Sequence, residues 1–418
     1  MTETELRRTA LYDIHAALGA SFTDFGGWDM PLRYSSDLLE HHAVRRAAGI
    51  FDLSHMGELW VRGPQAAAAL SYALVGRVLN LAVGRARYMM MVTPGGGIID
   101  DLIVYRVDES CFLVVPNAGN RERVSHELEQ RLQGFDLEFK DKSLTTSLIA
   151  VQGPLAVSVL EQVVDSGRFV EAALRPLAEP ATCGDAVCET PDVLSGKHIL
   201  SQLRYYAAVR VTIAGHTALL ARTGYTGEDG FEIFCTDADA ADLWEVITAA
   251  GEQLPPVELP DDTVLPALSP CGLAARDSLR LEAGMPLYGH ELTEEITPFD
   301  AGLGGVVAFD KGEFVGRSAL LERSELGGTE GSFALVALTG SGRRAARPGC
   351  TVLADSGEPA GEVTSGLLSP TLGYPVALAR VSAPVAAGWE PGASVQVDVR
   401  GRTMEMTVVA PPFYKRQK

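Results

Sequence analysis

The sequence lacks any apolar run that approaches the ~20 residues a membrane-spanning helix needs. The segment from Met1 to Arg8 carries two glutamates and no apolar core, so we expect neither a secretory signal nor a transit peptide. Positive charge is also scarce: 35 lysines and arginines face 54 aspartates and glutamates, which gives a formal net charge of −19. This excess repels phosphate backbones and anionic lipid, so neither nucleic acid nor a membrane is an expected partner.

Cysteine is sparse, with six residues scattered along the chain and no CxxC pair, so reduced thiols and a cytoplasmic location are expected. A dinucleotide-binding glycine fingerprint, a P-loop and an HExxH motif are all absent, and the eight histidines form no ligand pattern. His55 is more typical of a buried structural histidine than of a catalyst. The sequence therefore indicates no metal, no flavin and no nucleotide.

The composition is that of a folded protein of two or three domains, with 418 residues, 46% of them hydrophobic and 21% charged. Strand-like and helix-like runs alternate through most of the chain, which predicts α+β sheets with helices on one face. Beyond Gly327, short β-type runs with glycine turns predict a small β-barrel or sandwich. We expect domains over 1–325 and 326–418. Two aperiodic stretches, 178–196 and 254–270, are expected to be surface loops.

Two adjacent carboxylates, Asp100 and Asp101, stand in a β-type run over 98–106, which a glycine-rich turn joins to the run 87–93 in a predicted hairpin. The strand period sends the two side chains to opposite faces, so only one of them can face a common cavity. Asp101 shares its face with Tyr105. A second interpretation stays open, in which both carboxylates finish the turn and cap backbone amides.

A glycine-rich turn from Arg222 to Gly230 presents Tyr225, and Glu232 lies just inside the strand that follows. A carboxylate there is able to accept paired hydrogen bonds from an amino-heterocycle. The alternative is an ordinary tight turn with a solvent-facing glutamate.

The run from Gly272 to Gly284 predicts a helix in which Arg276 and Arg280 lie one turn apart on the same face. Either the two arginines meet an anion together, or they pair with Asp277 and Glu282 at helix spacing. The pattern by itself favours the ion pairs.

Together, several segments of the chain resemble those of the glycine cleavage system T-protein, the aminomethyltransferase family. They occur in the family's order and span nearly the whole chain: Asp24 to Leu32, Phe51 to Gly57, Gly96 to Tyr105, Thr223 to Glu232, Gly272 to Glu282, Phe314 to Gly316 and Thr364 to Gly373.

The resemblance implies an α+β, three-lobed cloverleaf-like fold with a central channel for tetrahydrofolate and a small C-terminal β-barrel. The region 1–325 is then the folate-binding part, built from two interleaved α+β lobes. The implied reaction takes the aminomethyl group from the lipoyl arm of H-protein and passes its carbon to tetrahydrofolate, with release of ammonia. Tetrahydrofolate is then a co-substrate, and no metal or flavin is needed.

The resemblance also implies roles for individual residues. Asp101 is similar to the essential carboxylate near the reactive folate nitrogens. We favour an electrostatic and positioning role for it over pure base catalysis, because a carboxylate in a low-dielectric channel stabilises the cation that forms as the C–S bond breaks. The implied folate-binding residues are Tyr88, Tyr105, Asn117, Tyr225, Glu232 and Arg276. Asp300 stands where the family commonly has glutamate, which leaves a ligand contact at that position open.

Two other functions also stay open: another tetrahydrofolate-dependent demethylase of the superfamily, and a folate-binding protein without catalysis. The lipoyl carrier is acidic in this family, so its docking requires local positive patches on this acidic chain. Arg343 and Arg344 with Arg347, and the tail with Lys415, Arg416 and Lys418, are the candidates. A solvated charged face is the alternative interpretation.

Overall fold

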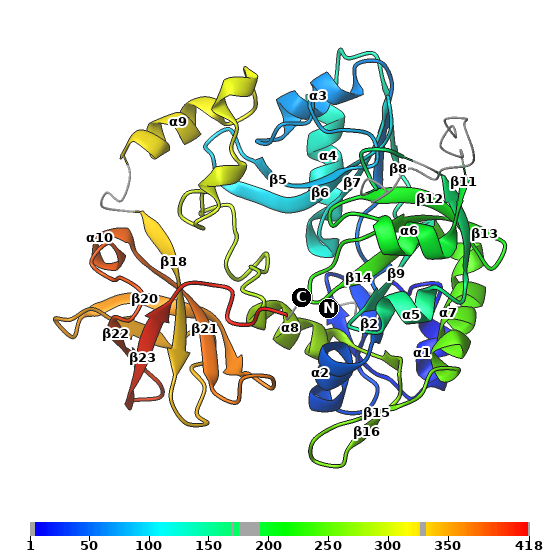
Figure 1. Ribbon diagram of the computed structural model, residues 1–418. Helices are drawn as coiled ribbons and strands as arrows, with labels where there is room; N and C mark the ends of the chain where they lie inside the picture. Colours follow the sequence, from blue (N-terminus) through cyan, green and yellow to red (C-terminus); the bar gives the residue numbers. More distant parts are fainter. Residues whose placement is uncertain (1–4, 169, 175–192, 327–331, 417–418) are drawn as a thin grey trace, which may run out of the picture.

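The computed structural model describes residues 5–168, 170–174, 193–326 and 332–416. Figure 1 shows three bodies, which are a five-stranded sheet, an eight-stranded sheet and a closed β-barrel. Helix α8 (Leu273–Glu282) lies between the barrel and the eight-stranded sheet. Among the described helices, none has both the length and the apolar character that crossing a bilayer requires.

The five-stranded sheet is antiparallel, with strand order β5-β6-β7-β4-β8. Helices α3 (Ala66–Ala73) and α4 (Arg121–Arg131) cover one of its faces, where alternate residues such as Met89, Leu102 and Phe112 form a buried core. The strands are β4 (Leu59–Arg62), β5 (Ala86–Val92), β6 (Ile98–Asp108), β7 (Cys111–Val115) and β8 (Glu138–Asp141).

The eight-stranded sheet has the order β11-β10-β12-β13-β14-β9-β3-β17, and its edge strand β17 runs parallel to β3. Helices α1 (Tyr12–Ala17), α5 (Ala156–Leu160), α6 (Gly196–Gln202) and α7 (Asp237–Glu252) pack on one face. The strands are β3 (Gly49–Asp52), β9 (Thr146–Gln152), β10 (Val164–Arg168), β11 (Val193–Ser195), β12 (Ala208–Ile213), β13 (His216–Ala221), β14 (Gly230–Thr236) and β17 (Ser269–Pro270).

The faces that these helices leave uncovered pack against each other. Tyr105, Leu113 and Val115 of the first sheet share one buried core with Ala150 and Phe234 of the second. Because side chains alternate along a strand, each sheet contributes one set of residues to its helices and the other set to this shared core. The site residues on β6 and β14 are thereby brought together.

Shorter elements connect these layers. Helix α8 begins after Gly272, where a Cβ would collide with the carbonyl oxygen of Leu32, so only glycine lets α8 approach β2 this closely. The connecting elements are β1 (Ser21–Phe25), β2 (Trp28–Arg33), α2 (Asp37–Arg46), η1 (Ala118–Asn120), β15 (Val257–Glu258), β16 (Val264–Leu265), η2 (Gly304–Val306), η3 (Phe309–Lys311) and α9 (Arg317–Leu326).

The C-terminal barrel closes in the order β18-β21-β20-β19-β22-β23, with the short helix α10 (Ala383–Ala386) beside it. Its interior is filled by alternate aliphatic residues such as Val352, Val363 and Val397. Its strands are β18 (Phe333–Gly340), β19 (Thr351–Leu353), β20 (Pro359–Leu368), β21 (Pro375–Ser382), β22 (Ser394–Asp398) and β23 (Thr403–Val409).

The α+β class, the C-terminal barrel and the hairpin that contains the aspartate pair are confirmed. Most of the predicted loop 178–196 lies outside the described residues. The loop 254–270 is more ordered than expected, because it contains the β15–β16 hairpin and ends in β17. Pairing of Ser269 and Pro270 with β3 satisfies backbone groups that a free loop would leave to water.

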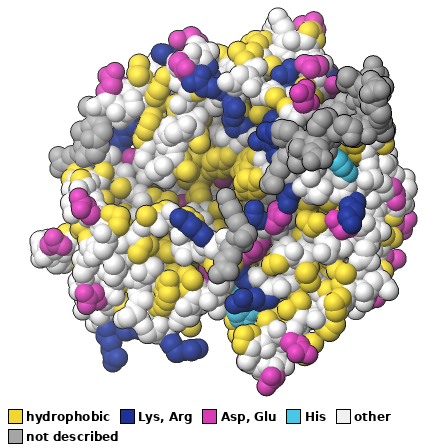
Figure 2. All heavy atoms as spheres, in the orientation of Figure 1, with side chains coloured by type: hydrophobic (Ala, Val, Ile, Leu, Met, Phe, Trp, Pro, Cys, Tyr) yellow, Lys and Arg dark blue, Asp and Glu magenta, His cyan; other side chains and the backbone are white. Residues whose placement is uncertain are grey.

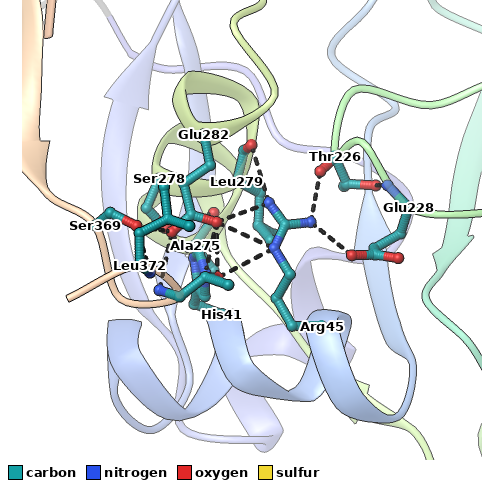
Figure 3. Close-up of polar contacts among 11 residues, drawn as sticks. His41, Arg45, Thr226, Glu228, Ala275, Ser278, Leu279, Glu282, Ser369 and Leu372 are labelled. Carbon is teal, nitrogen blue, oxygen red and sulfur yellow. Dashed lines mark hydrogen bonds and ion pairs between the residues drawn. The ribbon is translucent and has the colours of Figure 1, made fainter. Parts of the chain in front are cut away.

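A buried carboxylate, Glu282, holds several of these parts together at the end of α8 (Figure 3). Its Oε2 accepts hydrogen bonds from Arg45 Nε (3.1 Å) and Nη2 (2.9 Å) of helix α2 and lies 3.2 Å from His41 Nε2. From the barrel, the Ser369 hydroxyl and the Thr371 amide (3.0 Å) donate to Oε1. One side chain therefore joins α8, α2 and the β20–β21 loop of the barrel.

Arg45 extends the same network toward the glycine-rich turn. Its Nη1 donates to the Thr226 carbonyl at 2.7 Å and to Glu228 Oε1 at 3.0 Å (Figure 3). Burial raises the pKa of Glu282, but the hydrogen bond and charge of His41 and the charge of Arg45 outweigh it and lower the pKa to about 2. This cluster of residues 41, 45, 226, 228, 282, 369 and 371 is called the Glu282 hub below.

We expect Glu282→Gln to lower the free energy of unfolding by about 3 kcal/mol, because it removes one of the two carboxylates that compensate the buried Arg45. Urea denaturation measures the loss. Glu362→Gln is the matched control, since Glu362 pairs with Arg380 on the barrel surface, and it should cost less than about 1 kcal/mol. Equal losses for the two variants would contradict the role of the Glu282 hub.

The depressed pKa of Glu282 also predicts a pH dependence of stability. Its contribution is complete above its ordinary pKa of 4.5 and is lost as the pH falls toward about 2, where the folded carboxylate takes up its proton. Stability of the wild type should therefore fall more steeply than that of Glu282→Gln between those two values. If the Tm values of the wild type and of Glu282→Gln fall in parallel over this pH range, this contribution is ruled out.

Candidate active site

The aspartate pair lies in the middle of the β5–β6 hairpin, and the two side chains point to opposite faces. Asp101 is opposite Met90 in the register and Asp100 is opposite Met91. Asp100 is fully buried, whereas Asp101 is partly exposed on the face that carries Tyr88 and Tyr105. The alternation expected from the strand period is confirmed.

Asp100 has a structural role. Its Oδ2 accepts the Asn117 amide at 2.9 Å, and its Oδ1 accepts Asn117 Nδ2 at 2.9 Å and Asn120 Nδ2 at 2.6 Å. The capping interpretation is therefore correct for Asp100, although the amide that it caps belongs to the segment after β7 and not to the hairpin turn. Burial and the neighbouring Asp101 raise the pKa of Asp100 well above its ordinary value.

Asp101 is held by two donors. The Tyr88 hydroxyl donates to Oδ2 at 3.0 Å, and Asn117 Nδ2 donates to Oδ1 at 2.8 Å. Burial raises the pKa of Asp101 to about 6, while the hydrogen bonds from Tyr88 and Asn117 oppose that rise. Each carboxylate oxygen still has an acceptor position for a ligand. The side chain is thus oriented, partly desolvated and able to change its charge near neutral pH.

Glu232 of β14 faces the first sheet across the shared core. Its Oε2 accepts the Tyr105 hydroxyl at 3.3 Å and the Thr223 hydroxyl, and Tyr105 and Thr223 lie 3.0 Å apart. No described residue donates to Oε1 of Glu232. The interpretation of Glu232 as a solvent-facing turn residue is wrong, because its side chain is buried and burial raises its pKa.

Arg276 of α8 lies over the ring of Tyr225, with its guanidinium carbon 4.7 Å from the ring centroid. Within the described residues, its guanidinium makes no hydrogen bond or ion pair with the protein. The Tyr225 hydroxyl donates to the Pro286 carbonyl, which fixes the ring under the arginine. The five N–H groups of Arg276 are therefore available to an anionic or carbonyl-bearing ligand.

The two arginines of α8 do not act together, so that interpretation is wrong. Arg280 is buried and donates to Asp277 Oδ1 at 2.8 Å and to Glu291 Oε2 at 3.1 Å. The predicted Arg280–Asp277 pair is thus confirmed, but Glu282 binds Arg45 and neither arginine of its own helix. Arg280 is thus held in ion pairs, whereas Arg276, one turn earlier, forms none with the described residues.

Two of the other residues that the sequence singled out, His55 and Asp300, are buried, and Nδ1 of His55 has no hydrogen-bond partner among the described residues. Burial and the charge of Arg276 lower the pKa of the buried His55 to about 3, so its imidazole is neutral. Asp300 is also buried and accepts hydrogen bonds from the Phe333 amide (3.1 Å) and Arg323 (3.0 Å), which ties it to the first barrel strand. The described donors to both carboxylate oxygens of Asp300 belong to other parts of the fold, so Asp300 is not part of this site.

Tyr206 was missed by the sequence reasoning. It precedes β12 with a φ of 57°, in the left-handed region that is uncommon for a bulky residue. Burial raises its pKa, and Glu232 and Asp101 raise it further, so its hydroxyl lies within electrostatic reach of both carboxylates. The adjacent Tyr205 packs edge-on against it, with ring centroids 4.8 Å apart. No turn motif in the sequence signals this backbone conformation.

Most of the predicted site residues thus come together on neighbouring elements. Tyr88, Asp101 and Asn117 form one hydrogen-bonded group on the first sheet, and Tyr105 with Glu232 forms a second group that bridges to β14. Arg276 and Tyr225 form a third, and the charge of Arg276 acts on Glu232. Within the described ranges, no three His, Cys, Asp or Glu side chains are arranged to hold a metal ion.

Comparison with known proteins identifies the same protein family in both the N-terminal and the C-terminal part of the chain. The family model for the GCVT N-terminal domain matches residues 11–176 and 192–311, and that for the glycine cleavage T-protein C-terminal barrel domain matches residues 334–415. An aminomethyltransferase of Corynebacterium jeikeium is 50% identical over 99% of this chain and 100% of its own length. One of Streptomyces coelicolor is 49% identical, with 100% of both chains covered.

A solved structure supports the fold assignment. The crystal structure of the glycine cleavage system aminomethyltransferase T from Bartonella henselae superimposes with a TM-score of 0.79 at 33% identity, covering 98% of both chains. The chain therefore belongs to the glycine cleavage T-protein (aminomethyltransferase) family.

Proposed function

We propose that this protein is the aminomethyltransferase of the glycine cleavage system, which moves the one-carbon unit from the aminomethyl-lipoyl arm of H-protein to tetrahydrofolate and releases ammonia. The observation that carries the proposal is the Asp101 carboxylate, held by Tyr88 and Asn117 on the sheet face that also brings in Tyr105 and Glu232. The full-length identity of about half to curated aminomethyltransferases supports the same reaction.

The free polar groups of the site fit tetrahydrofolate, the one-carbon acceptor of this family. The unused Oε1 of Glu232 suits the adjacent N–H donors of an amino-pyrimidinone, and the unpaired guanidinium of Arg276 suits a carbonyl or carboxylate oxygen. Tyr88, Tyr105, Tyr225 and Asn117 complete the proposed folate-binding set. Bound tetrahydrofolate supplies the nitrogen that takes the carbon.

The lobes of the proposed cloverleaf correspond to the two sheets and the barrel, and the folate channel lies between them. Figure 2 shows a hollow near the middle of the molecule, lined largely by hydrophobic side chains, which supports such a channel. A division of the chain at 325–326 belongs to the same proposal. The gap between the matched family segments, which end at 311 and resume at 334, is consistent with it.

Asp101 acts in this reaction mainly through its charge and its position. Tyr88 and Asn117 hold the carboxylate before reaction, so stabilising a developing cation needs no reorganisation at the moment of C–S cleavage. A pKa near neutrality also lets Asp101 take the proton that the attacking nitrogen loses. The protein requires no metal or flavin for these steps.

Lipoylated H-protein is the proposed partner, with no role for nucleic acid or a membrane. The cytoplasm is the proposed compartment, which the free thiols of Cys111, Cys235, Cys271 and Cys350 support. The C-terminal tail is a weaker docking candidate than its sequence suggests, because Arg416 lies 3.3 Å from Asp229, and Lys418 is outside the described residues.

Incubation with tetrahydrofolate and aminomethylated H-protein tests the function directly. We expect stoichiometric ammonia and methylene-tetrahydrofolate. A demethylase of the same superfamily would leave H-protein unchanged and consume an N-methyl or sulfonium substrate, and a non-catalytic folate-binding protein would bind tetrahydrofolate without releasing ammonia. Either result would overturn the proposal.

We expect Asp101→Asn to lower kcat by about 30-fold or more, corresponding to about 2 kcal/mol of transition-state stabilisation, because the amide keeps the shape and loses the charge. Steady-state ammonia release measures this. Asp108→Asn, at the partly exposed end of the same strand, is the control and should leave kcat unchanged. Near-normal turnover of Asp101→Asn would remove Asp101 from catalysis and direct the test to Asp100.

The pKa of about 6 predicts that kcat/KM rises from pH ~5 to ~7, because only the ionised Asp101 stabilises a cation. Asp100 also has a raised pKa, so the apparent value belongs to the pair. This rise of kcat/KM with pH should be absent from the residual activity of Asp101→Asn. If kcat/KM of that variant still rises over the same pH range, the ionisation belongs to another group.

Glu232→Gln should raise the KM for tetrahydrofolate by at least about 10-fold and change kcat much less, because it weakens charge-assisted hydrogen bonds worth roughly 1.5–3 kcal/mol. Glu109→Gln, which replaces a side chain that is 84% exposed, is the matched control. A fall in kcat at unchanged KM would contradict a binding role for Glu232.

A further inference from the structure

A groove at one end of the barrel concentrates positive charge on this acidic protein. Two loops form its walls: the segment 344–351, which leads into β19, and the turn 398–401 between β22 and β23. Arg344 and Arg347 line one wall and Arg400 the other, around a cavity of about 580 Å³. Arg343 and Arg402 flank them in sequence. These five residues are called the arginine groove below.

The arginines of the groove are unpaired. All five are exposed, and within the described residues none forms an ion pair or a ring contact. Among the five side chains, only that of Arg344 makes a hydrogen bond within the described residues, from Nη2 to the Val399 carbonyl, which is a neutral acceptor. The carboxylate that lines the groove, Asp398, receives the Gly401 amide at 2.6 Å. Three arginines thus line the groove with a single carboxylate, in a chain of net charge −19.

The walls of the groove are preorganised. The Gly349 amide donates to the Val363 carbonyl at 2.8 Å, and the Cys350 amide donates to the Arg347 carbonyl at 3.1 Å, which fixes one loop against the barrel. On the other wall, Arg400 has a φ of 58° and is held in a tight turn by the Asp398–Gly401 contact. Binding of a ligand here therefore costs little free energy for ordering of the backbone.

The charge distribution selects the kind of ligand. A long polyanion such as nucleic acid would extend from the groove beyond the barrel onto a chain of net charge −19, which repels it. A compact group of carboxylates on a partner protein needs only the footprint of the two loops. Carboxylates also match the planar, bidentate donor geometry of guanidinium groups. Figure 2 shows Lys and Arg side chains gathered at the lower edge of the barrel side of the molecule.

We propose that the arginine groove docks a carboxylate-rich segment of a partner protein. The binding is electrostatic. It lies on the barrel, outside the proposed folate site, so it serves recruitment and takes no part in the chemistry.

Fluorescence anisotropy with a labelled hexaglutamate peptide tests the proposal on the full-length protein. The triple variant R343E/R347E/R400E reverses three side chains that make no hydrogen bond or ion pair within the described residues, so the fold should persist; circular dichroism and a thermal melt check this. We expect at least a 10-fold weaker Kd in low salt. For the wild type, Kd should also rise steeply between ~20 mM and ~200 mM salt.

The control variant K142E/R46E/R210E makes the same change in net charge at exposed positions away from the groove and should keep the wild-type Kd within about twofold. Equal binding by the wild type and the groove variant, or equal losses in the two triple variants, would overturn the proposal. Tighter binding of a single-stranded oligonucleotide of equal charge would also overturn it, in favour of a nucleic-acid ligand. The assay is independent of catalysis, so its failure leaves the proposed aminomethyltransferase activity untouched.

Discussion

The position of helix α8 depends on one buried ionic contact, between Glu282 and Arg45. The carboxylate reaches α2 and the barrel loop, and the guanidinium reaches the glycine-rich turn that carries Tyr225. A buried charge is tolerated only when its partners are in place, so the four segments must assemble together or leave an unpaired charge in the interior. Arg276, two turns earlier on α8, lies over Tyr225, and Arg45 holds the turn that carries Tyr225 through the Thr226 carbonyl.

The second constraint is that the two adjacent aspartates have different roles. Asp100 is buried and saturated with hydrogen bonds, and it holds Asn117, which in turn donates to Asp101. Asp101 is left with two donors, a raised pKa and an orientation toward the side chains of the second sheet. A carboxylate whose acceptor positions were all filled would have no capacity for a ligand, and one without support would have no defined position.

The barrel is tied to the rest of the molecule at both of its ends. Ser369 and Thr371, in the loop between β20 and β21, bind the Glu282 hub, and Asp300 fixes the start of β18. The arginine groove lies at the same end of the barrel as the β20–β21 loop, where β18 and β22 end and β19 and β23 begin.

The sequence by itself determined the local patterns. The β5–β6 hairpin, the opposite faces of Asp100 and Asp101, the barrel and the family motifs were all predicted from it, because strand period, turn residues and motif order are properties of neighbouring residues. Only the tertiary structure decided which charges find each other. Glu282 pairs with Arg45, 237 residues away, and not with an arginine of its own helix; Arg276 is left free; and Tyr206 adopts a left-handed conformation near both carboxylates. Such pairings depend on which buried groups the fold brings within hydrogen-bond distance, and spacing along the chain carries no information about that.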